Sequence, residues 1–111
     1  MNASARLDLA FHALADPTRR RIVERLARGE HPVMELAREF SISQPAVTKH
    51  LDALETAGII GRRRVGRQRI CYLRPKALES SVDWIARCRR FWNQRFDALE
   101  TLLAEHPSEE D

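Results

Sequence analysis

The feature of this sequence that most constrains its fold is a pair of short amphipathic segments joined by a tight polar turn. Apolar residues recur at helical spacing from Val33 to Phe40, and the polar stretch 41–43 follows at once. The second segment starts at Ser43, a good N-cap residue, and ends at Gly58. Three apolar residues recur along one face of it: Val47, Leu51 and Leu54. This pattern predicts two helices in a helix-turn-helix arrangement.

Two more helices are predicted ahead of this pair. The spacing of apolar residues indicates a short amphipathic helix from Leu7 to Ala15. Asp16 can cap the next helix, and Pro17 suits the first helical position because its missing N–H has no partner there anyway. Gly29 is a plausible stop for this second helix.

A hairpin and one long helix follow the pair. The strand-like runs 59–64 and 69–73 flank a four-residue turn in which Gly66 can adopt a positive φ. Pro75 then opens an amphipathic helix that covers about 76–104. The predicted fold is mainly α with a small β-hairpin, a winged helix-turn-helix in the order ααααββα.

The length of 111 residues predicts a single domain, which we assign to residues 1–106, followed by an acidic tail at 107–111. Hydrophobic residues make up 43% and charged residues 32%, which is enough for a core and a charged surface. The N-terminus does not resemble a signal peptide, and no stretch approaches transmembrane length. We therefore expect a cytoplasmic protein with no membrane association. Cys71 and Cys88 are expected to be reduced.

The charge is unevenly distributed. The formal net charge is only +3. However, the segment from Ser43 to Arg74 contains seven basic and two acidic residues, whereas the chain from Asp97 onward is acidic. Five arginines fall on the predicted hairpin: Arg62, Arg63, Arg64, Arg67 and Arg69. Such a cluster repels itself unless carboxylates or a polyanion compensate, and double-stranded DNA is the partner that fits best.

The second helix of the pair carries side chains suited to reading DNA. Gln44 can read adenine edges, Lys49 can meet guanine or phosphate, and Thr48 can contact a thymine methyl or a phosphate. His50 lies nearer the core face and is equally well explained as a phosphate contact or as a structural histidine. The residues predicted to bind DNA are Ser43, Gln44, Pro45, Thr48, Lys49, His50, Arg62, Arg64, Arg67 and Gln68.

The last helix carries more large apolar residues on one stripe than a chain of this size can bury by itself. A two-fold homodimer would cover them and would place two DNA-reading helices one turn of DNA apart. Arg95 also falls on this stripe and must reach the rim or a carboxylate. The residues predicted to form the dimer interface are Leu7, Phe11, Trp84, Cys88, Phe91, Trp92, Phe96 and Leu99.

Other functions have weaker support in the sequence. No nucleophile with a base, no paired carboxylates and no glycine-rich phosphate loop indicates an enzyme. A thiol-based redox sensor would need an accessible thiolate at Cys71 or Cys88, with its pKa lowered by nearby arginines. The position of Cys88 on the apolar stripe favours a buried structural cysteine instead. A winged-helix module that binds a protein partner remains the other alternative.

Three blocks of the chain resemble the ArsR-type (arsenical-resistance regulator) family of winged-helix repressors: ALADPTRRRIVERL, SQPAVTKHLDALETAGII and RRRVGRQRICYL. The resemblance covers about Leu7 to Leu73. It implies a homodimer that binds an inverted-repeat operator and represses transcription. The sequence identifies neither an effector nor whether the protein has one.

The resemblance also bears on metal binding. Metal-sensing members carry two cysteines at the places of Pro32 and Met34 here, and neither residue can supply a thiolate. A second kind of site uses Asp and His on the last helix, but Asp83 is followed two residues later by Ile85, and the next histidine is His106. The last helix, DWIARCRRFWNQRFDALETLL, is similar to that of the metal-independent branch of the family, which keeps aromatic residues there, and we expect no metal and no cofactor.

Overall fold

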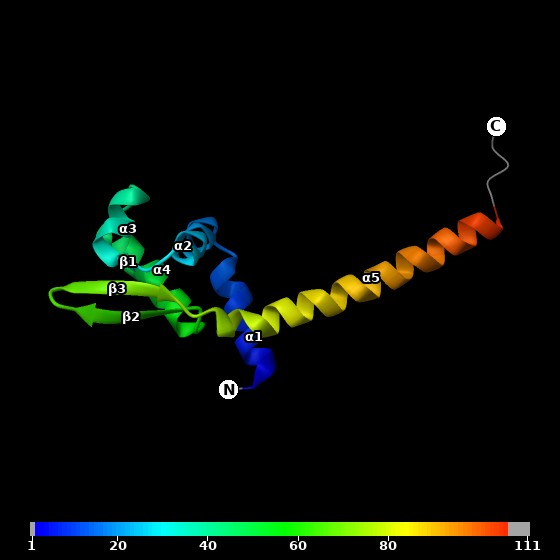
Figure 1. Cartoon of the computed structure of the whole chain (residues 1–111), viewed down its shortest axis with the longest axis horizontal. Helices are drawn as coiled ribbons and strands as arrows, with labels where there is room; N and C mark the ends of the chain where they lie inside the picture. The colour runs from blue at the N-terminus through cyan, green and yellow to red at the C-terminus, as the bar shows by residue number, and fades with distance from the viewer. Residues whose placement is uncertain (1, 107–111) are drawn as a thin grey trace. The chain divides into compact units, whose positions relative to one another are not determined.

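The computed structural model describes residues 2–106, which divide into two compact units, one ending at Ser81 and the other starting at Val82 (Figure 1). The first unit contains four helices, a three-stranded sheet and a short 3-10 turn. Its elements are α1 (Ala3–Leu14), α2 (Pro17–Ala27), β1 (His31–Pro32), α3 (Val33–Glu39), α4 (Gln44–Thr56), β2 (Ile60–Val65), β3 (Gln68–Leu73) and η1 (Pro75–Leu78). The last helix, α5 (Glu79–Glu105), continues through the second unit. The acidic tail predicted at 107–111 lies outside the described residues.

Local capping explains where the helices begin. The Asp16 carboxylate accepts hydrogen bonds from the backbone N–H groups of Thr18 and Arg19, and Pro17 occupies the first turn of α2, as predicted. These bonds hold the pKa of Asp16 below its ordinary value. The first helix starts earlier than the sequence indicated, because Asn2 caps it by accepting a hydrogen bond from Ala5 N at 2.8 Å.

The core of the first unit is built from the predicted helix stripes. Ile22 and Leu26 of α2 pack with Val33 and Leu36 of α3. The stripe of α4 is completely buried, since Val47, Leu51 and Leu54 are each 0% exposed. Burial of this stripe fixes which face of α4 is left for solvent or a ligand.

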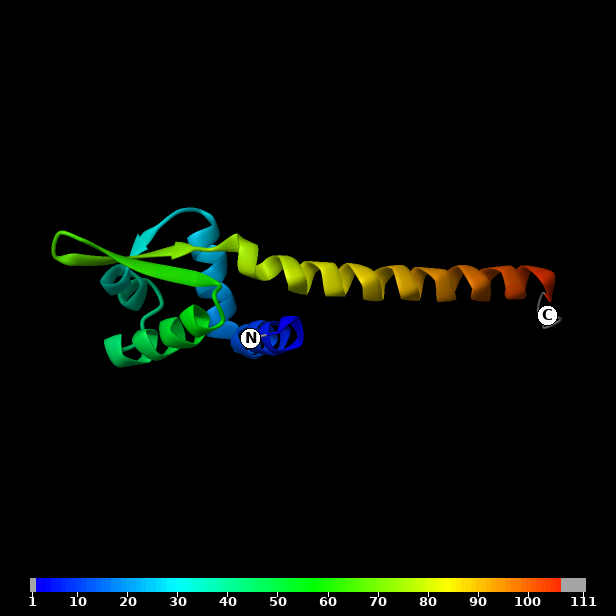
Figure 2. The ribbon, with the colours of Figure 1, turned by 90° about the horizontal axis from the view of Figure 1, so that it is seen from below.

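The sheet has the order β1-β3-β2, with β3 in the centre, and all its strands are antiparallel (Figure 2). The hairpin is confirmed, but its turn contains two residues instead of four, because Val65 and Gln68 pair in the ladder. Gly66 has a φ of +62°, as predicted. β1 was not predicted: it is an edge strand of two residues and contains Pro32, so neither length nor propensity marks it.

The 27 residues of α5 form one continuous helix. It starts at Glu79, after η1, so Pro75 opens a 3-10 turn and not the helix itself. Among the residues described in α5, only Ser81 is buried. Across residues 2–106, no helix combines the length and the apolar character that crossing a bilayer requires.

Candidate nucleic-acid interface

The exposed face of α4 carries the predicted reading residues. Ser43 caps the helix by accepting a hydrogen bond from Ala46 N at 3.2 Å. Because the apolar stripe of α4 is buried, the opposite side is left open. Five side chains line one shallow depression there: Gln44, Pro45, Thr48, Lys49 and Asp52. The side chains predicted to read bases therefore share one exposed surface.

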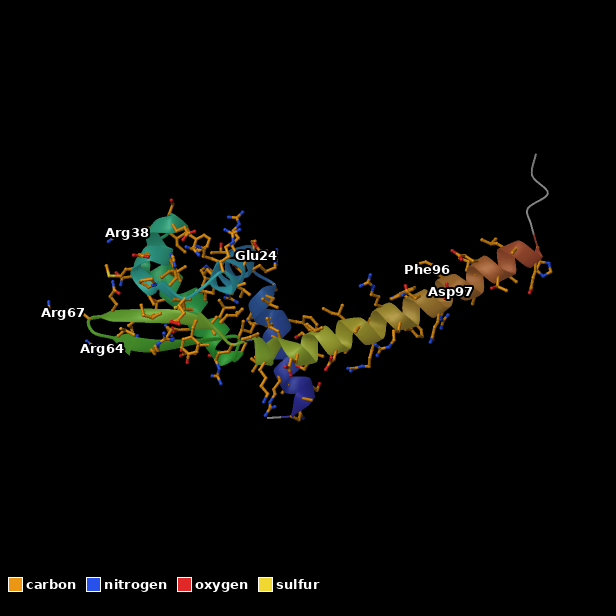
Figure 3. All side chains as sticks on the ribbon, viewed as in Figure 1. Glu24, Arg38, Arg64, Arg67, Phe96 and Asp97 are labelled. Carbon is orange, nitrogen blue, oxygen red and sulfur yellow. The ribbon has the colours of Figure 1, made fainter. Side chains whose placement is uncertain are left out.

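The hairpin β2–β3, here called the wing, carries four exposed arginines: Arg63, Arg64, Arg67 and Arg69. Figure 3 shows Arg64 and Arg67 at the far end of the wing and Arg38 on α3. Arg64 lies directly opposite Arg69 in the strand register. Gln68, the remaining predicted residue of the wing, is also exposed. The wing is therefore a strongly basic ribbon.

Arg62 is the exception in this cluster. Its guanidinium donates to Asp52 Oδ1 at 2.7 Å and to both carboxylate oxygens of Glu55 at 3.1 Å, and its side chain is only 12% exposed. These contacts raise the pKa of Arg62 and lower that of Glu55, chiefly through the hydrogen bonds between them. Arg62 thus ties the wing to α4 and neutralises two carboxylates beside the reading face. A direct contact between Arg62 and DNA, which the sequence suggested, stays a prediction.

Two arginines that the site prediction left out belong to the same surface. Arg38 of α3 and Arg69 of the wing line a groove that also includes Arg64, Arg67 and Gln44. Arg69 could have been chosen from the hairpin charge cluster. Arg38 could not, because only the fold brings α3 beside the wing. Arg63 instead pairs with Glu30 and stacks over the Tyr72 ring at 5.3 Å from its centroid.

The side chain of His50, in α4, lies next to the start of α2. Arg19 Nε donates a hydrogen bond to His50 Nδ1 at 3.2 Å, and Asp16 Oδ1 is 4.0 Å from the same nitrogen. The side chain is 20% exposed. Of the two interpretations from the sequence, this arrangement supports the structural histidine, while a phosphate contact stays a prediction.

Cys71 does not meet the requirements of the thiol-sensor alternative. It lies in the central strand at 0% exposure, and burial raises the pKa of its thiol to about 11. The lowered pKa that a thiol sensor requires is therefore not met at Cys71, because desolvation outweighs the attraction of Arg62 and Arg69. Cys88 is half-buried in α5.

We therefore expect Cys71 to resist modification in the folded protein. In a Cys88→Ser variant, which leaves Cys71 as the sole thiol, a maleimide should react slowly without denaturant and rapidly in urea. Mass spectrometry of timed samples measures both rates. Rapid labelling of the folded variant would restore Cys71 as a candidate sensor.

The predicted interface residues lie on α1 and α5. Leu7 is half-buried and Phe11 exposed on α1. On α5, Phe91 and Trp92 form an edge-to-face pair, and Trp92 and Phe96 are also 6.1 Å apart between ring centroids. The Arg95 guanidinium lies over the Phe91 ring, 4.8 Å from the centroid. Its reach to the rim or to a carboxylate across the interface stays a prediction.

The positions that would have to hold a metal do not fit one. Pro32 pairs with Ile70 in the sheet and offers no side-chain donor. Met34 is 56% exposed and cannot form a thiolate. Within residues 2–106, no three His, Cys, Asp or Glu side chains gather closely enough to hold a metal ion.

The packed α3–α4 pair and the basic wing beside it define a winged helix-turn-helix protein. Residues 16–61 match the family model described as "Bacterial regulatory protein, arsR family". The chain is 42% identical over 99 residues to the HTH-type transcriptional regulator Rv2034 of Mycobacterium tuberculosis, which covers 86% of this chain and 87% of that protein. It is 35% identical to the transcriptional repressor SdpR of Bacillus subtilis, over 68% of this chain and 83% of that one.

Solved structures with a similar fold belong to the same family. An ArsR family transcriptional regulator superposes with a TM-score of 0.75 at 37% identity, over 81% of this chain and 93% of that chain. An ArsR-like regulator from Rhodococcus sp. RHA1 gives a TM-score of 0.74 at 29% identity, over 89% and 93%. The chain belongs to the ArsR family. It is a DNA-binding transcriptional regulator and not an enzyme.

Proposed function

We propose that the chain is a repressor that binds an inverted-repeat operator through α4 and the wing of each subunit of a homodimer. The observation that carries the DNA contact is the continuity of the two surfaces. Gln44 lines both the depression on α4 and the groove beside the wing. A duplex can therefore meet the base-reading side chains of α4 and the arginines of the wing together.

Each predicted residue has a distinct part in this proposal. Gln44, Thr48 and Lys49 face the major groove, with Ser43 and Pro45 at the helix start close to a phosphate. Arg64, Arg67 and Gln68 of the wing meet the backbone or the adjacent minor groove. Because Arg62 neutralises Asp52 and Glu55, these carboxylates repel the approaching phosphates less.

The homodimer is supported by α5. Eight large apolar side chains in the described part of the helix are between 50% and 61% exposed: Val82, Ile85, Phe91, Trp92, Phe96, Leu99, Leu102 and Leu103. Exposed apolar surface of this extent on a single helix is typical of an interaction site, and a lone helix gains little stability without packing. A second copy of the same stripe would cover it.

The charges of α5 favour an antiparallel pairing. Between residues 87 and 95 the helix carries four arginines and no acidic residue, whereas between 97 and 105 it carries three acidic residues and no basic one. Antiparallel α5 helices would place the basic half of one subunit along the acidic half of the other. Parallel helices would place like charges together.

The proposal predicts how salt affects DNA binding. Lys49→Ala and Arg67→Ala should each weaken binding and reduce the slope of log K against log salt by about one, because each removes one positive charge that neutralises the DNA. Fluorescence anisotropy on a labelled promoter fragment at several salt concentrations measures both quantities. The control is Lys76→Ala in η1, which removes an exposed positive charge outside both surfaces. Equal slopes for all four proteins would contradict the assignment.

The proposal also predicts a loss of selectivity at one base. Gln44→Ala should lose about 1–3 kcal/mol of discrimination at a single operator position and bind random DNA as the parent does. Binding to a panel of single-base operator variants measures this. An equal loss on operator and random DNA would remove Gln44 from the base-reading set.

A further inference from the structure

The groove beside the wing differs from a simple phosphate-binding surface. It has a volume of about 540 Å³ and lies between the wing, α3 and the first residue of α4. This volume falls within the range of small-molecule sites in proteins. Its lining includes Val33 and Met34 together with the arginines Arg38, Arg64, Arg67 and Arg69. The groove is thus apolar on one part of its wall and basic on the other.

The basic part has few counter-charges: Glu55 attracts Arg69 through space but forms no ion pair with it. Arg64 and Arg69 face each other across the two strands, and like charges in directly opposed positions destabilise a sheet. The hydrogen bond that Arg64 makes runs to the carbonyl of Gly66, at 3.4 Å. In residues 2–106, no carboxylate pairs with Arg38, Arg64, Arg67 or Arg69. An anion bound between the two guanidinium groups would relieve this repulsion.

One acidic residue, Glu35, is among the described residues that line the groove. Its Oε2 atom lies 3.7 Å from His31 Nε2. Two other lining arginines are neutralised, since Arg62 binds Asp52 and Glu55 and Arg63 binds Glu30. Four unpaired arginines against one carboxylate leave the groove with a clear excess of positive charge.

The apolar part indicates a ligand with more than a charged group. Met34 is 56% exposed although it is a large apolar side chain, and Pro32 and Val33 continue the wall beside it. A DNA phosphate would gain nothing from contact with a thioether. A hydrocarbon or aromatic body would lose its water-exposed surface there and be stabilised by burial.

We propose that this groove binds a small amphipathic organic anion and that its occupation displaces DNA. The acid group lies between Arg64 and Arg69, and the apolar body packs against Met34. The displacement rests on the proposed function, in which Arg64 and Arg67 contact the DNA backbone. A ligand held by these arginines competes for them directly, so the groove is an inducer site within the DNA-binding surface.

The first arm of the test contains no DNA. 2-Naphthoate serves as the probe and is titrated into the ¹⁵N-labelled protein, with the arginine Nε–Hε and backbone signals followed by NMR. We expect shifts at Arg64, Arg69 and Met34, with affinity at least about tenfold weaker in Arg69→Gln and in Met34→Gln. Arg21→Gln, an exposed arginine of α2 outside the groove, should bind as the parent does.

Two related compounds decide what the groove recognises. Acetate has the acid group without the apolar body, and 2-naphthylmethylammonium has the body with the opposite charge. Neither should shift these signals at concentrations where naphthoate saturates. Equal binding of acetate would reduce the groove to a simple anion patch and overturn the proposal. Naphthoate shifts confined to α5, or no shifts, would overturn it as well.

The second arm adds a promoter fragment to the naphthoate-bound protein. Naphthoate should release DNA from the parent and not from Met34→Gln, which keeps every arginine of the wing. Binding of naphthoate without release of DNA would overturn the inducer role. If the parent bound no DNA at all, the proposed function would fail while the first arm still decided whether the site exists.

Discussion

Replacing Trp92 with alanine is expected to convert the proposed homodimer into monomers at micromolar concentration. Trp92 is 57% exposed in the single chain and lies at the middle of the α5 stripe, in contact with Phe91 and Phe96. In a two-fold interface each substitution removes two copies of the side chain. We expect a loss of about 3 kcal/mol, which is about a hundredfold in the dimer dissociation constant.

Sedimentation velocity over a range of concentrations measures this change. Asn93→Ala is the matched control, because Asn93 is the next residue along α5 and is exposed but is not part of the stripe. Circular dichroism shows whether both variants keep their helical content. A parent protein that sediments as a monomer, or a Trp92→Ala variant that dimerises as the parent does, would contradict the α5 interface.

Replacing Arg62 with alanine is expected to weaken operator binding by about 2 kcal/mol, about thirtyfold, although Arg62 is mostly buried. The variant leaves Asp52 and Glu55 unpaired beside the reading face of α4, where they repel phosphates. It also removes three hydrogen bonds that hold the wing against α4. Fluorescence anisotropy on the operator fragment measures the loss.

A double-mutant cycle separates the neutralisation of Asp52 and Glu55 by Arg62 from a direct contact between Arg62 and DNA. In the combination Asp52→Asn with Glu55→Gln, the further change Arg62→Ala should cost clearly less than in the parent, because no carboxylate is left to neutralise and only the hydrogen bonds that hold the wing against α4 are lost. If Arg62 contacts DNA itself, the cost of its removal will be the same in both backgrounds. That result would confirm the sequence-based prediction and contradict the positioning role.

The same contact has a pH dependence that checks the structure without DNA. The pKa of Glu55 is lowered in the folded chain, so its interaction with Arg62 stabilises the fold above the ordinary carboxylate pKa. This contribution is lost as the pH falls through the lowered pKa. Urea unfolding should therefore separate the parent from Arg62→Ala near neutral pH and bring them together in acid.

Sequence periodicity predicted most of the elements because the core of the first unit depends on it. Val47, Leu51 and Leu54 are the buried stripe of α4, and Gly66 occupies the turn of the wing. The strand β1 escaped prediction because two residues carry no periodicity, and one of them is a proline. Its pairing with β3 is a long-range contact, and the local sequence does not indicate it.

The candidate site also contains features that the sequence predicts and features that depend on the tertiary structure. The polar face of α4 could be predicted because burial of one stripe leaves the opposite face exposed. The partners of Arg62 could not, since a count of charges does not reveal that Asp52 and Glu55 of α4 lie within reach of β2. Arg38 was missed for a similar reason, because its place beside the wing depends on how α3 packs.

Hydroxyl-radical footprinting of the protein on a genomic fragment that it retains tests the proposed operator binding most directly. We expect two protected half-sites related by a two-fold axis, with centres about one turn of DNA apart (roughly 34 Å). Each should include minor-groove protection next to the major-groove contact, from the wing. A single unpaired footprint would contradict the homodimer, and retention no stronger than that of random DNA would contradict the proposed function.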